Sequence, residues 1–201
     1  MITYGKITKS LIIAWRFNFT VTGYQVYINT YFSNMSVLAI DVYYRPNDAK
    51  AVGVIFNWED AKPAETVVEY IRGVGDYVPG EFYKRELPCI QRIFEVVNLD
   101  TIQAIIIDGH MYIDNTGNFG LGGYAWQLLE NKIPVIGVAK SSFFANKETV
   151  IEVLRGESKN PLYISAIGVE LDIAASLIKN MHGSYRMPDI LKELDRITKE
   201  G

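Results

Sequence analysis

Four charged side chains lie within or at the ends of apolar stretches in this 201-residue sequence. Asp41 interrupts the run SVLAIDVYY, Asp108 ends the run AIIID, and Lys140 ends the run IPVIGVAK. Glu86 comes immediately before the helical pattern LPCIQRIFEVVNL. Burying an unpaired acid is costly, so these carboxylates require compensation. Carboxylates from separate elements can hold Mg²⁺, which activates water and offsets charge that develops on a phosphate.

Each charged residue also has a simpler interpretation. Asp41 could be an edge residue, and Asp108 could be a turn former. Glu86 could be an early helix residue that the helix dipole favours. Lys140 could form a salt bridge with Asp108 instead of contacting a phosphate. These alternatives remain open at the level of the single residues.

The elements around these residues predict an α/β domain with a mixed central β-sheet flanked by helices. The pattern predicts an antiparallel meander of three strands, over residues 36–44, 50–60 and 64–73. Groups at the carboxyl ends of adjacent strands converge in such sheets, which would bring the acids together. The remaining pattern predicts helices over 87–99, 119–132, 171–181 and 187–200, and strands over 104–109, 133–140, 148–156 and 160–168.

The composition bounds the classes of protein that this chain can belong to. A hydrophobic content of 49% over 201 residues supports one sizeable core. The net charge of −3 supplies no strong electrostatic case for nucleic acid. The single cysteine, Cys89, excludes an intramolecular disulfide and fits a cytoplasmic location. Polar residues interrupt the apolar stretch near the start, so we expect neither a membrane anchor nor a signal segment there.

The stretch VGDYVPGEFYKRELP places an aromatic residue on a stiff turn. Pro79 and Gly80 favour a turn, and Tyr77 comes just before it. An aromatic side chain in this position can fill the gap that an unstacked base leaves. Ordinary packing of the ring is the simpler alternative.

Six segments, in this order and spacing, resemble the endonuclease V family of deaminated-base repair nucleases. They are IDVYY, DYVPGEFYKRELP, AIIIDGH, FGLGGYA, PVIGVAKS and GSYRMPDILKELDRI. The resemblance covers residues 36–201, and residues 1–35 form a segment of unassigned role. It implies a ribonuclease H-like fold and a metal-dependent endonuclease, a hydrolase of DNA repair that cuts a phosphodiester near inosine in DNA or RNA.

The resemblance also implies roles for particular residues. Asp41, Glu86 and Asp108 match the acids that hold Mg²⁺, with Mn²⁺ as an alternative ion, and Lys140 matches a catalytic lysine. Tyr77 matches the wedge that enters nucleic acid. The positions that match the pocket for the extruded base are Gly80, Phe82, Gly109, Leu121 and Phe143.

One loop departs from the family pattern. The segment HMYIDNTGNFGLGGYA is one residue longer than its counterpart, and the family's loop histidine falls at Asp114 or Asn115. The basic residues that follow are replaced by Thr116 and Gly117. His110 is a partial substitute or a loop residue that contacts backbone. The alternative function is therefore a catalytically weak or inactive homologue that binds nucleic acid or a protein.

A second alternative comes from the segment GLGGYA, which satisfies the pattern G-x-G-x-x-A of dinucleotide-binding oxidoreductases. That pattern should follow its strand directly and open a helix. Here the residues HMYIDNTGNF separate it from AIIID. We therefore expect the glycines to permit close helix packing or the approach of a base.

Overall fold

The computed structural model describes residues 36–46, 48–73, 75 and 82–200. Strands β1 (Ser36–Tyr44), β2 (Asp48–Phe56) and β3 (Glu65–Arg72) pair antiparallel in chain order. This arrangement confirms the predicted meander. Residues that alternate along β1 and β2 point to opposite faces of the sheet, so both faces of these strands carry core side chains.

The described strands form one mixed sheet of seven strands in the order β3-β2-β1-β4-β5-β7-β6. β4 runs parallel to both β1 and β5, so the carboxyl ends of these three strands lie at the same edge. The sequence patterns predict that Asp41, Asp108 and Lys140 lie at this edge. The strands that complete the sheet are β4 (Ile102–Asp108), β5 (Val135–Ala139), β6 (Ile151–Val153) and β7 (Leu162–Ile167).

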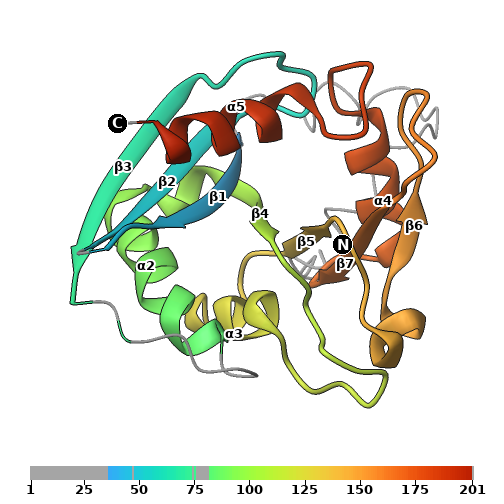
Figure 1. Ribbon diagram of the computed structural model, residues 1–201, viewed down its shortest axis with the longest axis horizontal. Helices are drawn as coiled ribbons and strands as arrows, with labels where there is room; N and C mark the ends of the chain where they lie inside the picture. Colours follow the sequence, from blue (N-terminus) through green and yellow to red (C-terminus); the bar gives the residue numbers. More distant parts are fainter. Residues whose placement is uncertain (1–35, 47, 74, 76–81, 201) are drawn as a thin grey trace, which may run out of the picture. The chain divides into compact units, whose positions relative to one another are not determined.

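Helices cover both faces of the sheet (Figure 1), and the sheet separates the buried side chains into two layers. α2 (Phe82–Val96) and α3 (Leu121–Leu128) pack on one face. α4 (Leu171–Asn180) and α5 (Asp189–Lys199) pack on the other. In the part of the chain that the structure describes, no helix combines the length and the apolar character needed to cross a membrane.

Several boundaries differ from the sequence prediction: β2 ends at Phe56 and not at residue 60, and α3 ends at Leu128 and not at residue 132. α2 begins at Phe82 and not at residue 87, so Pro88 lies inside the helix. The predicted strand over 148–156 is wrong for most of its length, because Phe144–Thr149 is a 3₁₀ segment and β6 spans Ile151–Val153. The buried Asn146 side chain stabilises this segment, since it accepts from the backbone N–H of Phe143 and donates to the carbonyl of Tyr112.

A buried lysine fixes the end of α5 against the sheet. Lys50 on β2 is only 6% exposed, and its Nζ donates to the carbonyls of Ile197 at 2.6 Å and Glu200 at 2.7 Å. These carbonyls lack partners within the helix, and a cation favours the negative end of the helix dipole. The contact holds the last turn of α5 beside β1, which carries Asp41.

Candidate active site

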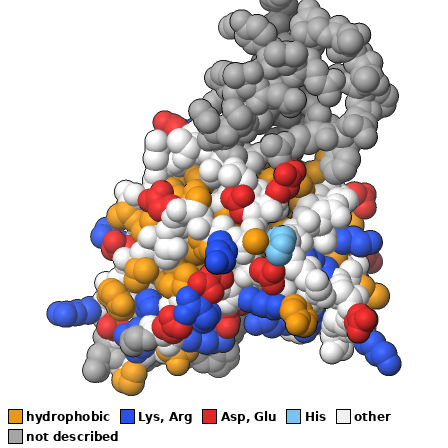
Figure 2. Space-filling view, turned by 90° about the horizontal axis from the view of Figure 1, so that it is seen from above, with side chains coloured by type: hydrophobic (Ala, Val, Ile, Leu, Met, Phe, Trp, Pro, Cys, Tyr) orange, Lys and Arg blue, Asp and Glu red, His pale blue; other side chains and the backbone are white. Residues whose placement is uncertain are grey.

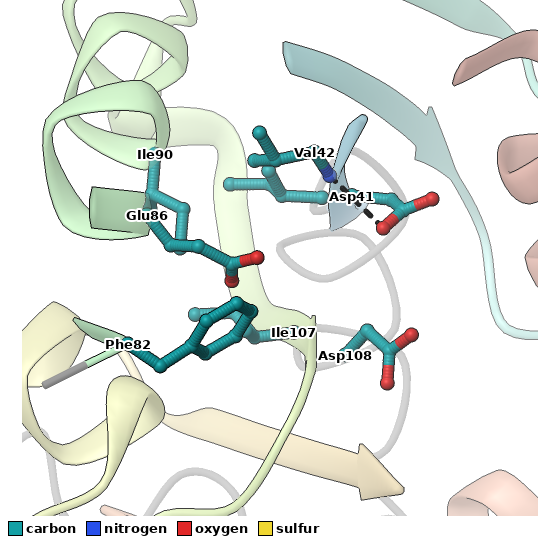
Figure 3. A pocket seen from close by; sticks show the side chains of 8 residues that line it. Asp41, Val42, Phe82, Glu86, Ile90, Ile107 and Asp108 are labelled. Atoms are coloured by element: carbon teal, nitrogen blue, oxygen red, sulfur yellow. Dashed lines mark hydrogen bonds between the residues drawn. The ribbon is translucent and has the colours of Figure 1, made fainter. Parts of the chain in front are cut away.

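Three carboxylates from three different elements line one cavity of about 220 Å³. Asp41 comes from β1, Glu86 from α2 and Asp108 from the end of β4. Glu86 approaches from the helix side, and the two aspartates lie on the opposite side of the cavity (Figure 3). The parallel pairing of β1 with β4 explains why residues 67 positions apart in the chain lie at one sheet edge.

Hydrogen bonds hold the Asp41 carboxylate at the side of the cavity. Its Oδ1 accepts from the backbone N–H of Val42 at 2.9 Å, and its Oδ2 accepts from Thr198 Oγ1 at 2.8 Å. Within the described ranges, no three His, Cys, Asp or Glu side chains form a group close enough to hold one ion. The three acids therefore line the same cavity, but their carboxylate groups do not meet at a single point.

The electrostatics of Glu86 show that this cavity concentrates negative charge. Glu86 is 8% exposed, and burial together with the charges of Asp41 and Asp108 raises its pKa to about 8. The guanidinium of Arg85 acts in the opposite sense but does not offset these effects. Metal-free Glu86 is therefore largely protonated at neutral pH.

Asp108 lies at the mouth of the cavity, where its side chain keeps access to solvent. The surrounding protein still removes water from the carboxylate and, together with Asp41 and Asp195, raises its pKa. Lys140 and Lys199 lower it through their positive charges. No ion pair joins the described side chains of Lys140 and Asp108, so the simple salt bridge considered from the sequence is not formed.

The last helix contributes residues that the sequence analysis did not single out. Asp195 lines a second hollow together with Asp41, Asp108 and Lys140. Thr198 is fully buried and donates to Asp41. Thr198 continues the buried stripe of α5 four residues after Leu194. A polar residue at a position where the helical pattern expects an apolar one was the sequence signal that could have identified it.

His110 contacts backbone, as one of the two interpretations of this residue expected. A ring nitrogen, Nε2, lies 2.8 Å from the carbonyl of Ser141, and the ring tilts against Phe143 with centroids 5.1 Å apart. His110 is 7% exposed, and burial lowers its pKa. Because burial disfavours the charged form of this ring, His110 is poorly suited to replace a cationic loop histidine.

The loop that departs from the family pattern uses its polar side chains internally. The Asp114 carboxylate accepts from the backbone N–H and hydroxyl of Thr116, and from the backbone N–H and amide of Asn118. These bonds lower the pKa of Asp114 to about 2. Asn115 Oδ1 accepts from the backbone N–H of Glu148 at 3.0 Å. Both residues at the histidine position therefore shape the loop.

Close packing explains the glycines of the segment GLGGYA. A Cβ on Gly122 would lie 1.7 Å from the Met111 side chain, and a Cβ on Gly123 would lie 2.7 Å from the Met111 carbonyl. A Cβ on Gly120 would lie 2.6 Å from the carbonyl of His110. The glycines thus let α3 approach the chain that follows β4, which supports the packing interpretation over a dinucleotide site.

The structure describes four of the residues assigned to a base pocket. Gly109 and Leu121 lie together, since a Cβ on Gly109 would be 3.8 Å from Leu121. Phe82 lines the acid cavity, and Phe143 is 52% exposed beside His110. The wedge residue Tyr77 and the pocket residue Gly80 lie outside the described residues.

The order of the strands and the helices on both faces match endonuclease V structures and define a ribonuclease H-like fold. The family model for endonuclease V matches residues 24–196 of this chain. The chain therefore belongs to the endonuclease V family, and this membership supports a nuclease function. The match begins within the segment 1–35, and the division at residue 35 stays a prediction.

Individual relatives agree with this assignment. Endonuclease V of Sulfolobus acidocaldarius is 27% identical over 174 residues, which cover 82% of each chain. The crystal structure of human ENDOV superposes with a TM-score of 0.65 at 18% identity and covers 95% of this chain and 93% of its own. Endonuclease V of Ciona intestinalis, solved with DNA containing an inosine followed by a ribo-adenosine, gives a TM-score of 0.67 at 17% identity and covers 82% and 84%.

Acidic and basic side chains lie side by side on one face of the described part of the chain (Figure 2). The net charge of −3 likewise indicates no excess of basic side chains in the chain.

Proposed function

We propose that this chain is a divalent-metal-dependent endonuclease that hydrolyses a phosphodiester near inosine in nucleic acid. The observation that carries the proposal is the shared cavity of Asp41, Glu86 and Asp108, where mutual repulsion contributes to a Glu86 pKa of about 8. Carboxylates that raise the pKa of a neighbour in this way would be stabilised in their charged form by a bound cation. Structural relatives crystallised with inosine-containing DNA support the choice of substrate.

The donor set fits a hard divalent cation. Asp41, Glu86 and Asp108 offer carboxylate oxygens, the ligands that Mg²⁺ prefers, and Mn²⁺ accepts the same set. We propose that these three residues would hold the ion. When bound, such an ion activates water and offsets negative charge on the phosphate.

The other residues would bind and orient the substrate. Lys140 lies beside Asp108 at the end of β5, where its ammonium group can contact a phosphate oxygen. We propose that Tyr77 acts as the wedge. The extruded base would occupy the pocket formed by Gly80, Phe82, Gly109, Leu121 and Phe143. Among these residues, Phe82 also lines the acid cavity, which supports a base pocket next to the proposed metal ligands.

A cleavage assay tests this proposal. Purified full-length chain would be incubated in Mg²⁺ with matched DNA and RNA strands that contain inosine or its unmodified counterpart. We expect nicking of the inosine strands, loss of nicking in EDTA, and no nicking by Asp41→Ala or Asp108→Ala. The ratio of the DNA rate to the RNA rate would give the preferred nucleic acid.

The rival function is a homologue that binds nucleic acid without cutting it. The internal hydrogen bonds of Asp114 favour this rival, because the loop offers no histidine at that position. If the chain retains inosine strands in a gel-shift assay but does not nick them at high enzyme excess, the binder replaces the nuclease as the function.

Thr198→Val is expected to weaken divalent-ion binding about tenfold, the usual cost of losing a group that orients a metal ligand. Thr198 Oγ1 donates to Asp41 Oδ2 at 2.8 Å, and valine keeps the shape but removes the donor. Calorimetric titration with Mn²⁺ measures the effect. Thr198→Ser keeps the hydroxyl and serves as the matched control. Equal Mn²⁺ affinity in all three proteins would show that this contact does not position the ligand.

A further inference from the structure

We propose that Tyr185 and Lys192 form a stacking subsite for one unpaired nucleotide of single-stranded nucleic acid beside the acid-lined cavity. The inference rests on the proposed function, because it names a further contact of the bound nucleic-acid strand in addition to the base pocket and the metal ligands. It concerns the loop between α4 and α5, which the preceding sections did not assign to the site.

Tyr185 presents an aromatic ring to solvent with a cation next to it. The residue is 67% exposed, and Lys192 Nζ lies 3.7 Å from the ring centroid. Lys192 also contacts Asp189 Oδ1 at 3.4 Å, and Asp189 Oδ2 contacts His182 at 2.9 Å. The ring thus stands outside the core, with much of its surface open.

A buried arginine holds this loop in one conformation. Arg155 is 4% exposed, and its guanidinium donates to backbone carbonyls on the turn after α4. Gly156 supports the same contact, because a Cβ there would lie 2.0 Å from the Ser184 carbonyl. A ring on such a loop binds with little loss of conformational entropy. The carbonyls that Arg155 contacts belong to Lys179, Met181, Gly183, Tyr185 and Arg186.

The next residues connect the ring to the candidate active site. Arg186 Nη2 donates to the carbonyl of Lys140 at 2.6 Å and to that of Pro161 at 2.6 Å. Met187 lines the hollow that contains Asp108 and Lys140. A hydrogen bond therefore joins the backbone of Lys140, the candidate catalytic lysine, to Arg186, which follows Tyr185.

The chemistry of this cluster fits a nucleotide. Aromatic side chains stack on bases without regard to sequence, and nearby cations contact the phosphates of the same strand. Three cations lie near this loop: Lys140 lines the hollow, Arg186 contacts the Lys140 carbonyl, and Lys192 lies over the Tyr185 ring. A ring that only completed the core would be covered, whereas two thirds of Tyr185 is open.

Binding of single strands that carry 2-aminopurine tests the subsite. The full-length chain, with Ca²⁺ in place of Mg²⁺, would be titrated with inosine-containing strands in which 2-aminopurine occupies successive positions on either side of the inosine. We expect stacking to quench 2-aminopurine at one position. Tyr185→Ala should abolish this quenching and raise the Kd about tenfold, as expected for the loss of one stacked base. Tyr185→Phe should retain both properties.

Tyr70 offers a matched control. It is 56% exposed on β3, and Arg45 lies 5.4 Å from its ring, but β3 is the edge strand two places from β1. Tyr70→Ala should leave the Kd and the quenching unchanged.

The outcomes separate this inference from the proposed function. If the native chain binds and nicks inosine strands but Tyr185→Ala matches it in Kd and quenching, the subsite is refuted and the nuclease stands. If quenching at one position depends on Tyr185 but no strand is nicked in Mg²⁺, the subsite stands and the nuclease is refuted. If the native chain binds no strand, both are refuted.

Discussion

Asp108→Asn is expected to lower the rate of inosine-strand cleavage by at least about a thousandfold, because several kcal/mol of metal-based stabilisation would be lost. Asparagine nearly keeps the shape of the side chain but removes one charge from the cavity that Asp41 and Glu86 also line. Single-turnover cleavage in saturating Mg²⁺ measures the rate. Calorimetric titration with Mn²⁺ should show weaker binding in the same variant.

Asp100→Asn is the matched control for this prediction. Asp100 is exposed and lies just before β4, whereas Asp108 ends that strand. We expect Asp100→Asn to cleave at the native rate. If Asp108→Asn cleaved within about tenfold of the native rate, a limit of about 1.4 kcal/mol, Asp108 would not be a metal ligand.

Glu86→Gln is expected to stabilise the metal-free protein at alkaline pH while it abolishes cleavage. The folded state raises the pKa of Glu86 from 4.5 to about 8. A raised folded-state pKa contributes stability that is fully present below the unfolded pKa and is lost as the pH rises through the folded pKa. The native free energy of unfolding in EDTA should therefore fall between pH values near 4.5 and 8, by up to about 5 kcal/mol.

Glutamine removes this loss because it carries no charge at any pH in the range. Urea denaturation in EDTA at several pH values measures the effect, and Glu86→Gln should show a smaller fall than the native protein. Glu95→Gln is the matched control, since Glu95 is exposed on the same helix α2 and pairs with Arg92 at the surface. Equal pH slopes in the native and Glu86→Gln proteins would contradict the assigned pKa.

Much of the fold follows from local patterns. The run SVLAIDVYY predicted a strand over 36–44, and β1 spans Ser36–Tyr44. The apolar run AIIID predicted a strand covered on both faces, and β4 lies between β1 and β5 with helices on each side. In contrast, the pattern at 148–156 resembled a strand, but the polar contacts of Asn146 favour a 3₁₀ segment ahead of a short β6.

The candidate site is predictable to a different degree for each residue. β1 and β4 run parallel with Ile40 beside Ile107, so Asp41 within β1 lies close to Asp108 at the end of β4. Glu86 joins them because α2 packs across the same strands. Their roles as ligands, like that of Lys140 as a phosphate contact, stay predictions. Resemblance to endonuclease V supplied those roles, which spacing alone left open.

By itself the sequence determined the α/β class, the family and which acids interrupt or end apolar runs, because alternation, apolar runs and ordered motifs are local properties of the chain. Tertiary structure alone decided that Thr198 holds Asp41 and that Arg155 fixes the Tyr185 loop. These contacts join residues 157 and 30 positions apart. Such pairs form only when the core has packed, since their hydrogen bonds depend on the relative positions of whole helices and strands.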